Sequence, residues 1–194
     1  MRRLISIVLL CLIGTEANSQ TALSERDFRN AQAYAVGVNV AYTVAESLIN
    51  LEAEADRGFF ILKVCINPGL ATTAAFTNWA LFRTTTASSG GTVITTESST
   101  TVAYLNRLNQ RNAIWSGAAR TAGTEGASGP LIDTASIYVS TATTQNIETC
   151  HTYCTYGTQC PYIPKGITNG VKLMFTGTAG GAGQSARIEF IATE

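Results

Sequence analysis

Charged side chains are scarce in this chain. Lys and Arg together number 13, Asp and Glu also number 13, and the charged residues make up 13% of 194 residues with a net charge of zero. That share is about half of what soluble domains usually carry. Without an excess of positive charge, nothing displaces the counterions of a phosphate backbone, so nucleic acid is excluded as an expected partner. Attraction to anionic lipid by charge alone is excluded for the same reason.

The chain also has few of the groups that catalysis uses. It contains one histidine, His151, and no nucleophile-elbow, zinc-protease, P-loop or dinucleotide-binding motif. The glycine-rich stretch 177–183 links two predicted strands and lacks the helix N-terminus that phosphate binding requires. Because an active site needs a nucleophile, an acid–base pair or a metal, we expect a protein that is not an enzyme and holds no cofactor.

No apolar run is long enough to span a bilayer, which takes about 20 residues. The longest, Leu4–Ile13, follows two arginines and precedes Ala17-Asn18-Ser19. This order of a positive region, a short apolar core and small residues is typical of a secretory signal peptide. We therefore predict that residues 1–19 are removed before Gln20, and that the protein is secreted, periplasmic or displayed at the cell surface.

Four cysteines follow this leader: Cys65, Cys150, Cys154 and Cys160. An even number in an exported chain indicates two disulfides. We predict one long-range bridge from Cys65 to the later cluster and one local bridge inside that cluster. The alternative is a metal site made of His151 and the last three cysteines. Their spacing matches no standard zinc pattern, and an oxidising compartment disfavours free thiolates, so we predict no metal.

Residues 20–58 carry an apolar stripe at alternating spacings of three and four residues, which is typical of an amphipathic helix. Its members are Phe28, Ala31, Ala35, Val38, Tyr42, Ala45 and Ile49. The stripe predicts one long helix, ended by Gly58, which would serve for self-association. On such a helix Glu52, Glu54 and Asp56 would form a solvated face.

A rival pattern overlaps this stripe. Bulky β-branched and aromatic residues alternate strictly with smaller or polar ones from Tyr34 to Val44, and such alternation is a strand signal. In that interpretation a helix would start only at Thr43. The helix is favoured because both flanks are rich in helix formers, but the sequence leaves residues 34–44 open between helix and strand.

From Phe59 onward the pattern is that of strands separated by turns. The predicted strands cover residues 59–66, 76–83, 92–96, 101–105 and 131–139, followed by a hairpin of 171–176 with 186–192. The expected fold is α+β and mainly β. It would be an antiparallel β-sandwich-like domain of six to eight short strands over residues 59–194, with one long N-terminal helix.

Polar positions are filled mostly by Thr, Ser, Asn and Gln, whose surfaces lose water more easily than charged ones. We therefore expect an exported structural or assembly protein, such as a filament, surface-layer or adhesin subunit, that forms homo-oligomers. One alternative is a module that binds a carbohydrate or cell-surface ligand through Tyr153, Tyr156 and Tyr162 in the cysteine-rich loop. The other is a membrane-active protein that inserts its N-terminal helix.

Overall fold

The computed structural model describes residues 33–40, 47–71, 74–94, 102–104, 115–121, 124–141, 148–154, 160–176 and 184–193. Within these residues the chain forms twelve β-strands and no helix. The strands are β1 (Ala33–Val40), β2 (Ser47–Glu52), β3 (Phe59–Asn67), β4 (Ala75–Thr84), β5 (Thr92–Val93), β6 (Val102–Tyr104), β7 (Ala119–Thr121), β8 (Ser128–Val139), β9 (Thr149–Thr152), β10 (Tyr162–Ile163), β11 (Gly170–Phe175) and β12 (Gln184–Ala192).

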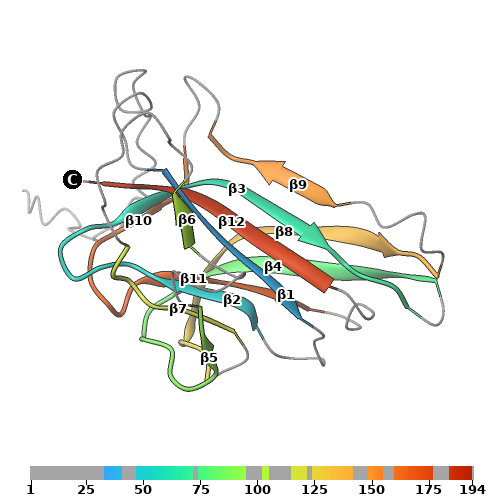
Figure 1. The fold of residues 1–194 in the computed structure, drawn as a ribbon, viewed down its shortest axis with the longest axis horizontal. Helices are drawn as coiled ribbons and strands as arrows, with labels where there is room; N and C mark the ends of the chain where they lie inside the picture. Colours follow the sequence, from blue (N-terminus) through green and yellow to red (C-terminus); the bar gives the residue numbers. More distant parts are fainter. Residues whose placement is uncertain are drawn as a thin grey trace, which may run out of the picture.

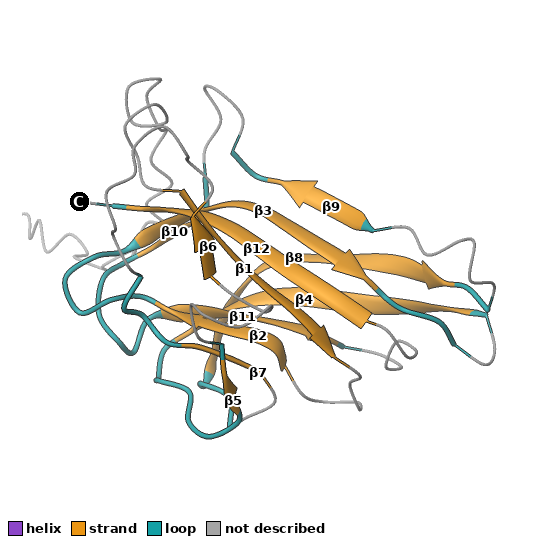
Figure 2. Ribbon diagram, viewed as in Figure 1, coloured by secondary structure: helices purple, strands orange, loops and turns teal. Residues whose placement is uncertain are grey.

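The strands form two antiparallel sheets that lie as two layers (Figures 1 and 2). The first sheet has the order β10-β3-β12-β1-β6, with β9 as a further partner of β3. The second has the order β5-β7-β2-β11-β4-β8. The mainly β, antiparallel part of the prediction is confirmed, and the strands expected over residues 59–66, 76–83 and 131–139 are β3, β4 and β8.

The pairing of the strands is nested along the chain. β1 pairs with β12, β2 with β11, β3 with β9 and β10, and β4 with β8. The chain is therefore one long antiparallel ribbon, folded so that successive segments of it alternate between the two sheets. Further pairs of β12 with β3 and of β11 with β4 close the layers side by side. This is the strand order of a jelly roll, in which two Greek keys share one core.

The long N-terminal helix is wrong wherever the structure describes the segment. Residues 33–40 are β1 and residues 47–52 are β2, while residues 20–32 and 41–46 lie outside the described residues. The rival alternation was the better guide, because Tyr34, Val36 and Val38 are all buried on one face of β1. None of the described residues forms a helix with the length and apolarity needed to cross a bilayer.

The predicted C-terminal hairpin is also wrong. Both strands exist, but β11 lies in the second sheet between β2 and β4, and β12 lies in the first sheet between β1 and β3. Alternation of apolar and polar residues along each strand indicates that it has a buried face. It does not indicate which strand is the partner, and here the two strands belong to different sheets.

The core is a layer of side chains between the two sheets. Trp79 and Trp115 belong to it and are 1% and 4% exposed. Phe190 of β12 is fully buried at the centre of an aromatic group, with ring centroids 5.3 Å from Tyr34, 5.2 Å from Phe59 and 4.9 Å from Trp115. Such tilted and offset ring pairs stabilise a core beyond the area that they bury.

Candidate functional site

The two sheets are joined at one side by a polar cluster formed by Asp133, His151 and Tyr153. Asp133 lies on β8 of the second sheet, His151 lies on β9 of the first sheet, and Tyr153 follows β9. One carboxylate oxygen of Asp133, Oδ2, accepts a hydrogen bond from the Tyr153 hydroxyl at 2.7 Å and lies 2.9 Å from Nδ1 of His151. We call these three residues the intersheet cluster, because their contacts cross from β8 to β9.

The hydrogen bonds and burial of the intersheet cluster are those of a link that holds the two sheets together. Burial, then the hydrogen bond to Asp133 and then the charge of Asp133 all raise the pKa of Tyr153 far above its ordinary value. Tyr153 therefore remains a hydrogen-bond donor at every working pH. The ring of His151 packs edge-on against buried Trp79 at 4.9 Å. No sequence pattern indicates this cluster, because Asp133 and His151 are 18 residues apart and meet only through the pairing of the strands.

The two disulfides are one long-range bridge and one local bridge, as predicted. Cys65 pairs with Cys150 across 85 residues, and Cys154 pairs with Cys160 across 6 residues. The first bridge joins directly opposite positions of β3 and β9. The alternative metal site at His151 would need three of these sulfurs as ligands, and all three are bonded to other sulfurs.

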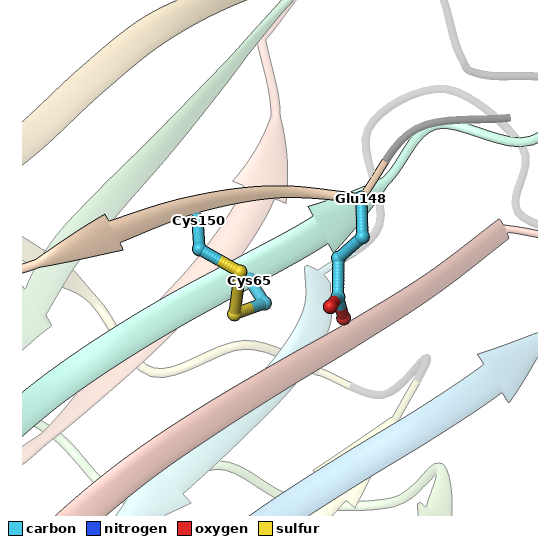
Figure 3. A group of neighbouring side chains, drawn as sticks. All are labelled: Cys65, Glu148 and Cys150. Atoms are coloured by element: carbon cyan, nitrogen blue, oxygen red, sulfur yellow. A yellow bond between two sulfur atoms is a disulfide. The ribbon is translucent and has the colours of Figure 1, made fainter. Parts of the chain in front are cut away.

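Figure 3 shows the carboxylate of Glu148 beside the Cys65–Cys150 bridge. The possible ligand atoms of these three residues lie within 4.8 Å of one another. A cysteine binds a metal as a thiolate, and the disulfide leaves neither sulfur in that form. Arg187 of β12 lies near the same place, with a guanidinium nitrogen 3.9 Å from the Glu148 carboxylate. The group is therefore a disulfide flanked by the Glu148 carboxylate and the Arg187 guanidinium, and it offers no thiolate for a metal.

The tyrosines of the cysteine-rich loop serve mainly as packing in the part that is described. Tyr153 and Tyr162 are half-buried and cover the apolar cluster that contains Phe60 and the Cys154–Cys160 bridge. The ring of Tyr162 lies 4.8 Å from that of Phe60. Tyr156 lies outside the described residues. The predicted binding surface therefore has two of its three tyrosines turned at least partly toward the protein itself.

The stripe predicted for self-association does not form a surface in the described residues. Ala35, Val38 and Ile49 are 6%, 3% and 0% exposed. Val38 of β1 and Ile49 of β2 belong to the core between the sheets, whereas Ala35 lies on the other face of β1. Phe28, Ala31, Tyr42 and Ala45 lie outside the described residues. The three described members of the stripe therefore lie on two strands and not on one face of a helix.

An open edge is present instead at β8, the last described strand of the second sheet. Its part from Asp133 to Val139, which we call the β8 edge stretch, pairs with β4 in unbroken register. The outward side chains of this stretch are Thr134, Ser136 and Tyr138, all exposed and uncharged. Tyr138 is 51% exposed and Phe76 is 72% exposed. The centroids of their rings are 5.4 Å apart.

Two acids that the helix hypothesis placed in solvent are buried. Glu52 is 8% exposed and accepts two hydrogen bonds from Ser88 at 2.6 Å, one from its backbone nitrogen and one from its hydroxyl. Glu54 is 2% exposed, and its carboxylate accepts from the Ser116 hydroxyl at 2.7 Å and from Arg57 Nη2 at 2.8 Å. Glu52 therefore attaches the loop after β4 to the end of β2. Glu54, two residues further on, attaches the loop that lies before β7.

The lowered pKa of Glu54 predicts that the fold loses stability in acid. Burial, the largest influence, raises the pKa of Glu54, but hydrogen bonds from Arg57 and Ser116 and the charge of Arg57 outweigh it and lower the pKa below 4.5. The carboxylate therefore stabilises the fold fully above pH 4.5, and this contribution is lost as the pH falls through the lower folded-state pKa. Glu54→Gln should lower the free energy of unfolding at pH 7 by about 2 kcal/mol.

Urea unfolding of wild type and Glu54→Gln at pH 7 and at pH 3 measures this effect. The difference between the two proteins should shrink at the lower pH, because protonated Glu54 then resembles the amide. Asp56→Asn, at an exposed neighbouring position, is the matched control and should change stability little at either pH. A Glu54→Gln difference that is equal at both pH values would contradict the assignment.

Comparison with protein-family models, with curated proteins and with solved structures gives no match to this chain. Its function is therefore argued from its own residues.

Proposed function

We propose that the protein is an exported, non-enzymatic assembly subunit whose copies associate by antiparallel pairing of the β8 edge stretch with the same stretch of a second copy. The observation that carries this proposal is the edge of the second sheet at β8, which is almost uncharged and pairs on its outer side with no described strand. An edge strand exposes unpaired backbone groups, which form a template for another strand. Two disulfides are compatible with the oxidising compartment that an exported subunit would meet.

The charge pattern of β8 supports pairing rather than protection. Soluble proteins commonly guard an edge with a projecting lysine or another charge. Asp133 is the one charged residue of β8, and His151 and Tyr153 hold its carboxylate toward the first sheet. Pro130 lies near the start of the strand, outside the β8 edge stretch, so it removes no hydrogen-bond donor from that stretch.

The choice of a second copy as the partner follows from symmetry. An antiparallel pair of identical strands is related by a two-fold axis, so one patch is complementary to itself. The two six-stranded sheets would then continue into each other across the dimer. The exposed rings of Phe76 and Tyr138 lie next to this seam and would lose water on pairing. This route replaces the N-terminal stripe as the means of association.

Sedimentation velocity of the disulfide-bonded chain starting at Gln20 tests the proposal. Wild type should show a concentration-dependent monomer–dimer equilibrium. The variant Ser136→Lys/Tyr138→Lys places like charges on both strands of the pair and should raise the dimer Kd at least about tenfold. The control Ser89→Lys/Thr168→Lys adds the same charge at exposed positions away from the edge and should leave the Kd unchanged.

Two results would contradict the proposal. One is a wild-type chain that stays monomeric up to its solubility limit. The other is association that the edge lysines weaken no more than the control lysines do, which would place the interface on another surface.

A further inference from the structure

A pocket of about 290 Å³ opens where the second sheet meets the turn that follows β10. Its wall includes Arg83, Thr84 and Thr85 at the end of β4, Pro130 in β8, and Ile163 and Pro164 at the end of β10. Small-molecule sites usually measure about 300 to 1,000 Å³. This pocket is at the lower limit, which suits one monosaccharide or one amino-acid residue.

Arg83 is one of the partly buried cations that have no ion pair among the described residues, and it is the one that lines this pocket. Arg57 pairs with Glu54, and Lys172 pairs with Glu125 at 2.7 Å. No ion pair of Arg83 occurs with any described residue. Burial lowers the pKa of Arg83 and is the one cause of that shift, so no described carboxylate lies close enough to oppose it. A partly buried cation without an ion pair among the described residues is suited to an external anion.

We propose that this pocket binds a small carboxylate ligand through Arg83. The planar guanidinium offers two parallel N–H donors that match the two oxygens of a carboxylate. The adjacent Thr84 and Thr85 supply hydroxyls, and Pro130, Ile163 and Pro164 supply apolar contact for the remainder of the ligand. A sugar acid and the C-terminal carboxylate of a peptide share this chemistry.

The backbone around the pocket is held in place before any ligand arrives. Gly170 lies in the wall, and a Cβ there would come within 2.4 Å of the Leu51 carbonyl oxygen and 2.9 Å of the Thr84 hydroxyl oxygen. The strands therefore approach more closely here than a side chain would allow. Asn169 donates from its side-chain amide to the Lys165 carbonyl oxygen at 2.8 Å, which fixes the turn beside the pocket. Such a preformed site loses little ordering entropy on binding.

Isothermal titration calorimetry with glucuronate, and with glucose as the uncharged sugar of the same ring size, tests the assignment. N-acetylglycine represents the peptide carboxylate, and inorganic phosphate represents the other oxyanion. Wild type should bind glucuronate or N-acetylglycine with a Kd in the millimolar range or below and should not bind glucose measurably. Of the two carboxylates, the tighter binder identifies the source of the ligand.

Three variants assign the binding to Arg83. Arg83→Gln should raise the Kd for the carboxylate at least about tenfold, because charge-assisted hydrogen bonds are lost. Arg83→Lys keeps the positive charge but loses the two parallel N–H donors, so its Kd should lie between those of wild type and Arg83→Gln. Arg120→Gln, whose native side chain donates to the Gly90 carbonyl oxygen away from the pocket, should bind as wild type does. Thermal melts of all three should stay close to wild type, since Arg83 has no described internal partner.

The assignment is overturned if neither carboxylate binds up to about 20 mM, where even a millimolar site would be nearly saturated. It is also overturned if Arg83→Gln binds as wild type does, or if phosphate binds and the carboxylates do not. The pocket wall shares no residue with the β8 edge stretch. The lysine variants of that stretch should therefore keep the carboxylate affinity, which separates this result from the outcome of the association experiment.

Discussion

Replacing both Cys65 and Cys150 with alanine is expected to lower the free energy of unfolding by about 4 to 5 kcal/mol. The bridge closes a loop of 85 residues, and the entropy that a cross-link removes from the unfolded chain grows with the length of the loop. The same relation gives about 2 kcal/mol for the Cys154–Cys160 bridge, which spans 6 residues. Most ordinary domains have only about 5 to 15 kcal/mol of stability, so loss of the long bridge should leave the fold marginal.

Urea unfolding of Cys65→Ala/Cys150→Ala and Cys154→Ala/Cys160→Ala measures both effects. Loss of the long bridge should also raise the m-value, because an unfolded chain without that loop exposes more surface. The short bridge constrains little chain, so its removal should leave the m-value close to wild type. Equal m-values in the two variants, or a greater loss of stability from the short bridge, would show that the sulfur atoms act mainly through local packing.

How far the sequence predicted the fold depends on whether a feature is local. The strands β3, β4 and β8 could be predicted because patterns such as the apolar run Phe59–Ile66 and the alternation of Phe76–Arg83 reflect the burial of one strand's own faces. The partner of each strand could not be predicted. β11 and β12 follow each other in sequence, but they belong to different sheets, and nothing within either strand encodes that choice.

The N-terminal segment shows why the helix hypothesis failed. Ala35 and Val38 are three residues apart, which places them on opposite faces of β1, and Ile49 lies on β2. The two strands lie in different sheets, so the periodicity had no structural cause. Strict alternation at Tyr34, Val36 and Val38 matches the buried face of β1. The alanine content of the flanks reflects helix propensity, which tertiary context overrides here.

The candidate sites were the least predictable features. A spacing pattern can indicate which cysteines are paired locally, but the intersheet cluster needs Asp133 and His151 to meet across two sheets. The burial of Glu54 likewise depends on Ser116 and Arg57 around it. Charged residues are usually exposed, so an acid that is buried among specific donors is an exception that sequence reasoning predicts wrongly by default.

Phe190→Ala is expected to destabilise the fold by about 3 to 5 kcal/mol, the second largest effect foreseen for this chain. The side chain is fully buried and touches three aromatic rings, those of Tyr34, Phe59 and Trp115. Its removal leaves a cavity whose walls come from both strands beside β12 and from the loop before β7, and these cannot all collapse inward together. Phe190→Leu keeps most of the volume and should cost less than about 1.5 kcal/mol.

The matched control for Phe190→Ala is Phe76→Ala, the same change at a side chain that is 72% exposed, which should alter stability by less than about 0.5 kcal/mol. Thermal and urea unfolding would rank the three variants. The fluorescence of Trp115, whose ring centroid is 4.9 Å from that of Phe190, should change in the folded state of Phe190→Ala and not in that of Phe76→Ala. If the two alanine variants cost the same, the aromatic group is not the centre of the core, and the pairing of β12 between β1 and β3 must be stabilised mainly by the remaining aliphatic side chains.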